Sequence, residues 1–155
     1  MDHVQTYSTP LGPMTMVSDG TALTCLRFDR QDRLPAEPPQ NLPVFDRTKA
    51  WLDAYFNGAI PEEMPPLRPR GTAFQRSVWD LLLTIPYGQT VTYGALAKLL
   101  HSSARAVGGA VGRNPIAILI PCHRVVGVDS LTGYAAGLDR KIALLQLEGA
   151  AIPQR

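Results

Sequence analysis

One short run of the chain places four residues of distinct chemistry side by side. Pro121, Cys122, His123 and Arg124 follow an apolar segment that spans residues 116–120. A cysteine reacts as its thiolate, and an adjacent imidazole or cation raises the thiolate population. The neighbours of Cys122 therefore favour a nucleophile over a buried structural thiol, which is the commonest role of a free cysteine.

The other cysteine and the histidines do not suggest a metal site. Cys25 lies on an alternating segment with Arg27 as its nearby cation, which favours a structural role. Two cysteines and three histidines without CxxC or HxxxH spacing do not form a zinc ligand set. We therefore expect no metal, and two free thiols rather than a disulfide in a reducing compartment.

The adjacency of Cys122 and His123 limits the mechanism. Neighbouring side chains on an extended segment point to opposite sides, so a direct contact between the two is unfavourable. A proton relay through water is easier to build. A cysteine hydrolase of the Cys-His-Glu type is an alternative, and it predicts turnover without a permanent adduct.

Two short helices are expected before this segment. Thr92 can cap the first, and the second runs from Ala104 to about Gly112 after a break at residues 101–103. Helices joined by so short a break fit a helix-turn-helix. A DNA-binding regulator without chemistry is therefore a second alternative, and it predicts that Cys122→Ala leaves all activity intact.

The second helix is unusually smooth. Gly108 and Gly109 lie in its interior, where each costs ~1 kcal/mol relative to alanine, and Arg105 and Arg113 are its long polar side chains. A major-groove helix normally presents polar side chains to base edges, whereas a small, smooth helix can enter the narrow minor groove. Taken alone, these residues favour the other explanation, which is tight packing inside the domain.

The first 70 residues and the remainder differ in texture, so we place a domain boundary near Arg70. Before it, alternating runs separated by turn residues predict an antiparallel meander and one helix. After it, Thr72 can cap a helix to about Ile85. The meander strands are expected at 4–8, 14–17 and 23–28, the helix at Val44–Asn57, a proline-rich loop at 35–43 and a proline connector at 61–69.

The apolar sides of the helices define the expected core. The helix of the first domain should bury Trp51, Leu52, Tyr55 and Phe56. The helix that begins after Thr72 should bury Phe74, Val78, Leu81, Leu82 and Ile85, and the next one Ala95, Leu96, Leu99 and Leu100.

Composition sets the broad class. The chain has 155 residues, 45% hydrophobic and 18% charged, which suits one globular domain or two small ones. No apolar run approaches the ~18 residues of a membrane helix, and the N-terminus lacks a signal-peptide pattern, so a cytoplasmic protein is expected. Residues 1–70 carry seven basic and nine acidic residues (−2), and 71–155 carry eight and four (+4). The basic half suggests an anionic partner, although ordinary scatter of surface charge explains it equally well.

Several of these segments occur in one order that closely resembles a known family. They are Arg105-Ala106-Val107-Gly108-Gly109-Ala110, Asn114-Pro115, Ile120-Pro121-Cys122-His123-Arg124-Val125-Val126-Gly127 and Gly133-Tyr134. The order resembles that of the O6-alkylguanine-DNA alkyltransferases (methylated-DNA–protein-cysteine methyltransferases) in their stand-alone form. The match runs from about Gly71 to Gly149 and is looser before it. Cys122 argues against the family's binding-only relatives, which lack this cysteine.

The resemblance implies an α+β fold. A small antiparallel sheet domain with a helix, RNase H-like, should occupy residues 1–70. A mainly helical, winged-helix-like domain should occupy 71–155. The implied activity is direct-reversal repair without a cofactor: irreversible, single-turnover transfer of the alkyl group from O6-alkylguanine, and from O4-alkylthymine, in double-stranded DNA. The implied state is a monomer without membrane contact, with cooperative assembly on DNA as an option.

The resemblance also implies roles for individual residues. Cys122 would accept the alkyl group, His123 would relay the thiol proton, Glu148 would orient the imidazole, and Asn114 would be a hinge. Tyr93 would rotate the nucleotide, and Arg105 would fill the gap in the base stack. DNA contacts would include Ala106, Gly108, Gly109 and Arg113. The base pocket would be lined by Tyr93, Val125, Tyr134 and Ala135.

Two departures from the family pattern have consequences. Members that bind structural zinc carry several Cys and His residues in the first domain, where this chain has only His3 and Cys25. Some members place a bulky aromatic residue after the pocket tyrosine, where this chain has Ala135-Ala136-Gly137. We therefore expect no zinc, and a roomy pocket that accepts groups larger than methyl.

Overall fold

The computed structural model describes residues 2–29 and 40–153, which form two compact units. One comprises Met1–Arg70 with Pro115–Ala117, and the other Gly71–Asn114 with Ile118–Arg155. The expected proline-rich loop at 35–43 lies mostly outside the described residues.

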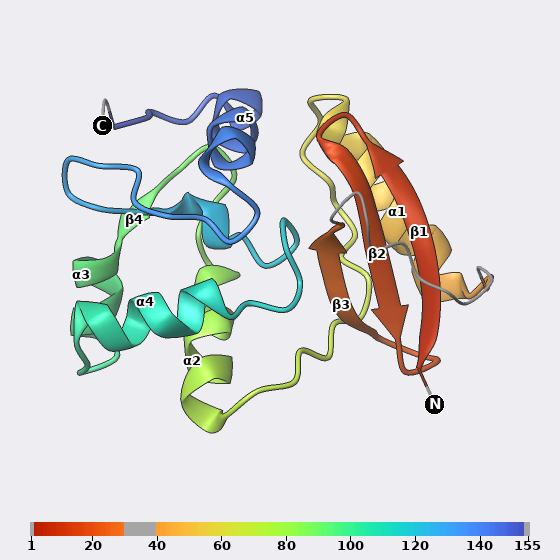
Figure 1. Ribbon diagram of the computed structural model, residues 1–155, viewed down its shortest axis with the longest axis horizontal. Helices are drawn as coiled ribbons and strands as arrows, with labels where there is room; N and C mark the ends of the chain where they lie inside the picture. The colour runs from red at the N-terminus through yellow and green to blue at the C-terminus, as the bar shows by residue number, and fades with distance from the viewer. Residues whose placement is uncertain (1, 30–39, 154–155) are drawn as a thin grey trace. The chain divides into compact units, whose positions relative to one another are not determined.

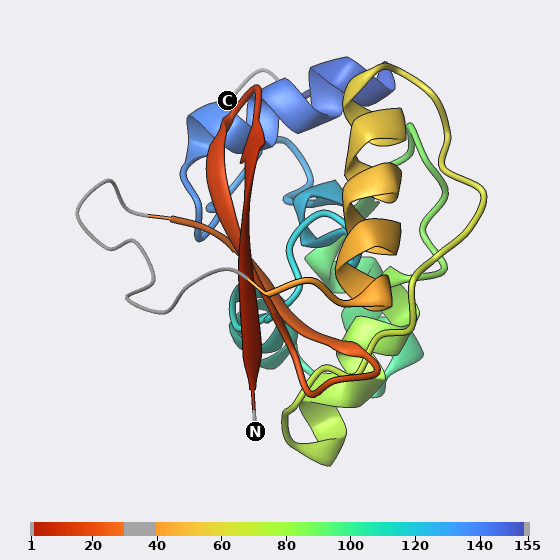
Figure 2. The same ribbon diagram turned by 90° about the vertical axis from the view of Figure 1, so that its right-hand side faces the viewer.

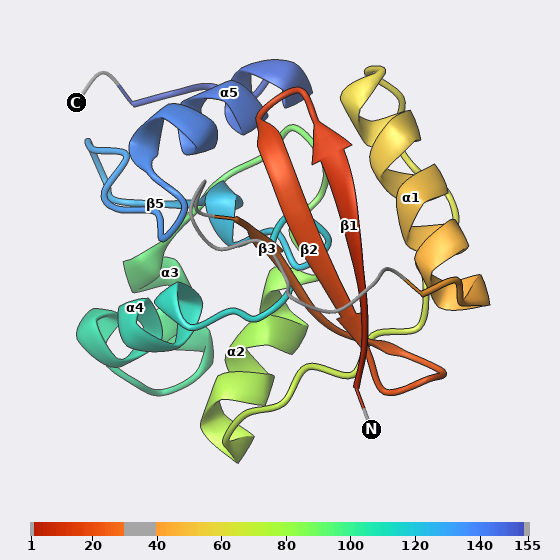
Figure 3. The same cartoon turned by 45° about the vertical axis from the view of Figure 1, so that its right-hand side comes forward.

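The first unit is a three-stranded antiparallel sheet with one helix. Strands β1 (His3–Thr9), β2 (Gly12–Ser18) and β3 (Leu23–Phe28) follow in sheet order β1-β2-β3. Helix α1 (Pro43–Phe56) packs against β1 and β2, and Figures 1 and 3 show it on one face of the sheet. The predicted meander and helix are thus confirmed.

The core of this unit is centred on β2, whose residues 14–16 are buried on both faces of the sheet. Met14 and Met16 on β2 are fully buried, and α1 contributes Phe45, Leu52 and Tyr55. Two backbone hydrogen bonds add a further segment to this sheet. Leu26 N–H donates to Pro115 O (2.9 Å), and Ala117 N–H donates to Leu26 O (2.8 Å). Residues Pro115–Ala117 therefore pair with the N-terminal unit although they lie far along the chain.

The second unit is mainly helical. Its elements are α2 (Ala73–Leu82), β4 (Val91–Thr92), α3 (Tyr93–Leu99), α4 (Ala104–Gly112), the 3-10 turn η1 (Cys122–Arg124), β5 (Val125–Val126) and α5 (Leu138–Glu148). The two short strands β4 and β5 pair in parallel. Helix α4 packs against α2 and α3, as Figure 1 shows, and Figure 2 shows the same elements turned by 90°. This arrangement contains the predicted helix-turn-helix, and the α+β class is confirmed.

Side-chain caps explain where these helices begin. Thr72 and Gln75 form a capping box at α2, Thr92 Oγ1 accepts from Ala95 N–H at α3, and Ser103 caps α4. The predicted start points were right. The predicted end of α2 was wrong. The helix ends at Leu82 rather than Ile85, and a turn follows it.

Three predicted core positions were also wrong. Phe74 is 37% exposed, Leu99 is 67% exposed and Ala95 is exposed as well, whereas Trp79 is buried. Trp79 lies against Gly71 and donates its indole N–H to Ala110 O at 2.9 Å. The tryptophan therefore lies on the inner face of α2, where it contacts Gly71 and donates a hydrogen bond to α4.

Within the described residues, no helix is long and apolar enough to cross a membrane. The same residues contain no group of three or more His, Cys, Asp or Glu side chains placed to hold a metal ion.

Candidate active site

Cys122 lies in a tight turn rather than on an extended segment. Cys122–Arg124 form η1, in which Arg124 N–H donates to Pro121 O at 3.0 Å. The residue is 9% exposed and follows the buried run of residues 116–120. The alternation argument for opposite side chains therefore does not apply here, because a 3-10 turn spaces side chains by about a third of a turn.

His123 is paired with the carboxylate that the sequence analysis assigned to it. Its Nε2 lies 2.6 Å from Glu148 Oε2, and both side chains are fully buried. Glu148 is the last residue of α5, which ends where Gly149 adopts a left-handed backbone (φ 72°). His123 Nδ1 has no hydrogen-bond partner among the described residues. The imidazole is thus held at one nitrogen and open at the other.

The position of Arg124 in the cysteine turn suggested that its charge favours the thiolate. Instead, its guanidinium is hydrogen-bonded to Glu148. Its Nε donates to Glu148 Oε1 at 2.8 Å and its Nη2 to Oε2 at 3.1 Å, while Nη1 donates to Ile85 O at 2.8 Å. The guanidinium also lies 5.8 Å from the ring centre of Tyr87. Gly88 N–H completes the set by donating to Glu148 Oε1 at 3.0 Å. Glu148 is therefore held by a bidentate cation, a backbone amide and the His123 imidazole.

The pKa shifts place the resting site in its neutral form. Burial lowers the pKa of His123, and this outweighs the opposing hydrogen bond and charge of Glu148; the charges of Arg124 and Lys141 lower it further. Burial raises the pKa of the Cys122 thiol, opposed by hydrogen bonding from Asn114 and Tyr134 and by the charge of Lys141. A thiol beside a neutral base needs proton transfer before attack.

Asn114 and Tyr134 surround the thiol from two other segments. Asn114 directly follows the C-cap of α4, and its Nδ2 donates to Ile120 O at 2.8 Å, which joins α4 to the cysteine turn. Burial raises the pKa of Tyr134 well above its usual value, so its hydroxyl stays protonated. Both residues thus lie at the site to which the resemblance assigned them.

The backbone carbonyls of Cys122 and Val125, beside the expected base pocket, each accept one hydrogen bond. Cys122 O accepts from Val125 N–H, and Val125 O accepts from Lys141 Nζ at 2.8 Å. A carbonyl oxygen has two lone pairs, so each retains an acceptor site. Ala135, the last of the expected pocket residues, is exposed.

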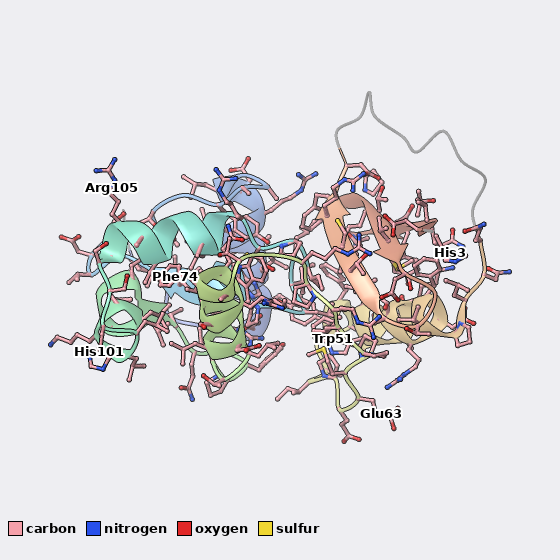
Figure 4. All side chains as sticks on the ribbon, turned by 90° about the horizontal axis from the view of Figure 1, so that it is seen from below. His3, Trp51, Glu63, Phe74, His101 and Arg105 are labelled. Carbon is pink, nitrogen blue, oxygen red and sulfur yellow. The ribbon has the colours of Figure 1, made fainter. Side chains whose placement is uncertain are left out.

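Helix α4 presents its small residues to the outside. Arg105, Ala106, Gly109 and Arg113 are exposed, and Figure 4 shows Arg105 extending from α4 on the side away from α3. A Cβ added at Gly109 would meet nothing within 4 Å, and one at Gly108 would make only ordinary contact (3.8 Å) with the Tyr93 ring. Tight internal packing therefore does not explain these glycines, and the explanation that the residues alone favoured was wrong.

Tyr93 begins α3 and meets the segment after β5. Its hydroxyl lies 3.1 Å from Thr132 Oγ1, which donates to it. Thr132 has a left-handed backbone (φ 58°), which is strained for a β-branched residue. Tyr93 is thus placed between α4, through Gly108, and the segment that carries Tyr134.

Sequence reasoning missed Lys141, which is fully buried on α5. Its Nζ donates to the carbonyls of Val125, Leu131 and Gly133. No local pattern singles it out, because a lysine at this spacing also suits a solvated helix face.

Both halves of the chain match family models. The model described as 6-O-methylguanine DNA methyltransferase, ribonuclease-like domain, matches residues 3–65, and that described as the DNA binding domain matches residues 73–150. These matches agree with the predicted sheet domain and the predicted DNA-binding domain.

Relatives match over nearly the whole chain. A methylated-DNA--protein-cysteine methyltransferase of Mycobacterium bovis is 45% identical over 158 residues, covering 99% of this chain and 96% of the relative. One of Haemophilus influenzae is 44% identical over 149 residues, covering 92% and 83%. The crystal structure of Mycobacterium tuberculosis OGT in complex with DNA superposes with a TM-score of 0.86 at 45% identity, covering 98% and 96%. This chain therefore belongs to the 6-O-methylguanine DNA methyltransferase family, the methylated-DNA–protein-cysteine methyltransferases.

Proposed function

We propose that Cys122 Sγ accepts the alkyl group of O6-alkylguanine in double-stranded DNA and keeps it as a thioether. As a family member the chain is a methylated-DNA–protein-cysteine methyltransferase that acts in DNA repair by alkyl transfer. The observation that carries the assignment to Cys122 is the buried pair formed by the next residue, His123, and Glu148 of α5. The distance between His123 Nε2 and Glu148 Oε2 is 2.6 Å.

The site supports a balanced transfer. The Cys122 thiol gives its proton to His123 Nδ1 through water, the S–C bond forms, and the bond from carbon to guanine O6 breaks. Glu148 stabilises the imidazolium, as a carboxylate does in other nucleophile–base–carboxylate sites. The imidazolium then returns the proton to the departing guanine, so that the base is restored. Because the thioether is stable, each chain acts once.

The smooth face of α4 supports minor-groove binding. Exposed glycines let a helix approach a narrow groove, where readout is degenerate and shape matters. We assign Arg105 to the gap left by the rotated nucleotide and Tyr93 to the rotation itself, since the exposed Arg105 and the Gly108–Tyr93 contact lie along one helix. Ala106, Gly108, Gly109 and Arg113 complete this surface. The relative crystallised with DNA supports DNA as the partner of this surface.

The substrate range and molecular state belong to the same proposal. The site accepts O4-alkylthymine as a second substrate, and the pocket is walled by Tyr93, Val125, Tyr134 and Ala135, with Asn114 as the hinge between α4 and the cysteine turn. We place the protein in the cytoplasm as a monomer, with cooperative assembly on DNA.

Mass spectrometry after incubation with an O6-methylguanine duplex tests the proposal. We expect one added methyl group per chain, on the peptide that contains Cys122, and restored guanine in the DNA. Cys25→Ala should behave like the wild type, and Cys122→Ala should leave the lesion intact. An unmodified Cys122 with repaired DNA would contradict the assignment.

The same experiment separates the alternatives. A cysteine hydrolase would repair more than one lesion per chain and leave no permanent adduct. A regulator without chemistry would bind the duplex equally well with alanine at position 122 and would leave the lesion intact in the wild type.

A further inference from the structure

Lys141 is a buried cation that the mechanism above does not use. It lies in the second turn of α5, with no exposed surface. Its Nζ donates to Leu131 O at 2.6 Å, Val125 O at 2.8 Å and Gly133 O at 3.2 Å. In the described part of the chain, no carboxylate lies within ion-pair distance of it. Burying an ammonium without a counter-charge is unfavourable, so such a residue needs a structural or chemical reason.

The three carbonyls belong to the segment that forms the expected base pocket. Val125 directly follows the cysteine turn, and Leu131 and Gly133 precede Tyr134. Residues 127–137 contain neither helix nor strand, so few backbone bonds hold them in place. Thr132, between two of the tethered carbonyls, contacts the Tyr93 hydroxyl. One ammonium therefore fixes the course of the chain from the nucleophile to both pocket tyrosines.

Lys141 lies beside the cysteine turn, because its Nζ donates to Val125 O at 2.8 Å and Val125 N–H donates to Cys122 O, and its charge favours the thiolate. The titratable groups around Cys122 are His123 in the turn, Tyr134 in the following segment and Lys141 on α5. His123 and Tyr134 are neutral at rest, and Arg124 is paired with Glu148. Burial lowers the pKa of Lys141 to about 8, so it is largely charged at neutral pH.

The spacing on α5 explains how one helix serves both partners. Lys141 and Glu148 are seven residues apart, which is close to two helical turns, so both point to one face. That face presents a cation to the carbonyls that follow the cysteine turn and a carboxylate to His123.

We propose that Lys141 is a positioning residue that holds the pocket segment by its carbonyls and favours the thiolate form of Cys122 as the proton leaves. This inference rests on the proposed role of Cys122 as the acceptor. It predicts that Lys141 controls the pH dependence of the thiol as well as the structure of the pocket.

The test measures the thiol directly in a Cys25→Ala background. The rate of iodoacetamide reaction with Cys122 between pH 6 and 10 yields the midpoint of thiol ionisation. Lys141→Met should raise this midpoint by about one pH unit and slow the reaction ~10-fold below it. In Lys141→Arg the midpoint of thiol ionisation should stay close to that of the parent, because the positive charge remains. The rate of transfer from O6-benzylguanine should fall, since a planar guanidinium fits three converging carbonyls poorly. Lys49→Met, a lysine on α1, is the matched control and should match the parent.

The results separate failure of this inference from failure of the proposed function. An unchanged thiol midpoint in a folded Lys141→Met variant would overturn the inference, even where the wild type transfers the alkyl group normally. A wild type that takes no alkyl group at Cys122 would overturn the proposed function, and the iodoacetamide midpoint would still decide the coupling.

If Lys141→Met does not fold, the same coupling can be measured on the lysine. NMR of the labelled Lys141 side chain then gives the pKa of its ammonium. A thiolate raises the pKa of the neighbouring ammonium. Cys122→Ser should therefore titrate Lys141 at a lower pH than the wild type does, and equal midpoints would contradict the proposal.

Discussion

Glu148 is shared between a base and a cation, and this sharing decides the protonation state of the site. The carboxylate accepts from His123 on one side and from the Arg124 guanidinium on the other. With a neutral imidazole, the buried group of Glu148, Arg124 and His123 carries no net charge, so its burial is less unfavourable than that of a charged cluster. Arg124 thus favours the neutral form of His123, which the proposed transfer requires.

A pH profile of Arg124→Gln tests this balance. The charges facing His123 are Glu148 and Lys141 on α5 and Arg124 in its own turn, and Arg124 lowers the pKa of the imidazole. Its removal leaves Glu148 less opposed, so the pKa of His123 rises. The proposed transfer needs the neutral imidazole, so the rate of transfer from O6-benzylguanine should fall as the pH is lowered. In the variant, the midpoint of this fall should lie at a higher pH than in the wild type. The ordinary value for histidine is about 6.5, and the wild-type midpoint should lie below it. A downward or absent shift in the folded variant would show that Arg124 does not neutralise Glu148.

The small residues after Tyr134 predict broad substrate size. Ala135 is exposed and Ala136 and Gly137 follow it, so these three residues place no bulky side chain at this part of the proposed pocket. We expect the single-turnover rates for O6-benzylguanine and O6-methylguanine, both as free bases, to be comparable. Ala135→Phe should slow the benzyl reaction more than the methyl reaction. Complete inertness of the wild type toward O6-benzylguanine would contradict a roomy pocket.

At the scale of elements, α4 combines low intrinsic stability with an open surface. Gly109→Ala adds a methyl group where nothing lies within 4 Å, and alanine is favoured over glycine in a helix. We expect the free energy of unfolding to rise by about 1 kcal/mol while affinity for an O6-methylguanine duplex falls. Denaturant unfolding and a fluorescence binding titration measure the two effects. Equal or tighter DNA binding would mean that Gly109 does not face the groove.

Gly71, at the start of α2, predicts the opposite outcome for the same type of change. A Cβ at this position would lie 2.4 Å from Trp79 Cη2, a buried ring that cannot move aside easily. Gly71→Ala should therefore lower the free energy of unfolding by about 1–3 kcal/mol, as overpacking does in other cores. Urea unfolding followed by circular dichroism checks it, with Gly109→Ala as the contrasting glycine. An unchanged midpoint would show that the loop before Thr72 relaxes freely.

At the scale of the whole molecule, the charge balance of the two halves predicts the salt dependence of DNA binding. The second half carries +4 and the first −2, and exposed Arg113 lies at the C-cap of α4. If Arg113 contacts a phosphate, Arg113→Ala should weaken binding to all sequences and reduce the slope of log K against log salt by about 1. Binding titrations at several salt concentrations measure the slope. Arg27→Ala, in the first unit, is the control and should leave the slope unchanged. An unchanged slope in Arg113→Ala would show that Arg113 only caps its helix.

The sequence by itself determined the features that depend on neighbouring residues. Strand alternation, the caps at Thr72 and Thr92, and the run Pro121–Arg124 are local patterns, and the family order of motifs joined them to Glu148 and Asn114. The predicted strands and helix caps were confirmed, because both depend on residues a few positions apart.

Only the tertiary structure decided which distant groups meet. It paired Arg124 with Glu148 instead of the thiol, buried Trp79 instead of Phe74, and brought Lys141 to three carbonyls. It also showed that Gly109 faces open space. The physical reason is that the partner of a charge, or the space beside a glycine, depends on chain segments far away in sequence, so local spacing carries no information about it.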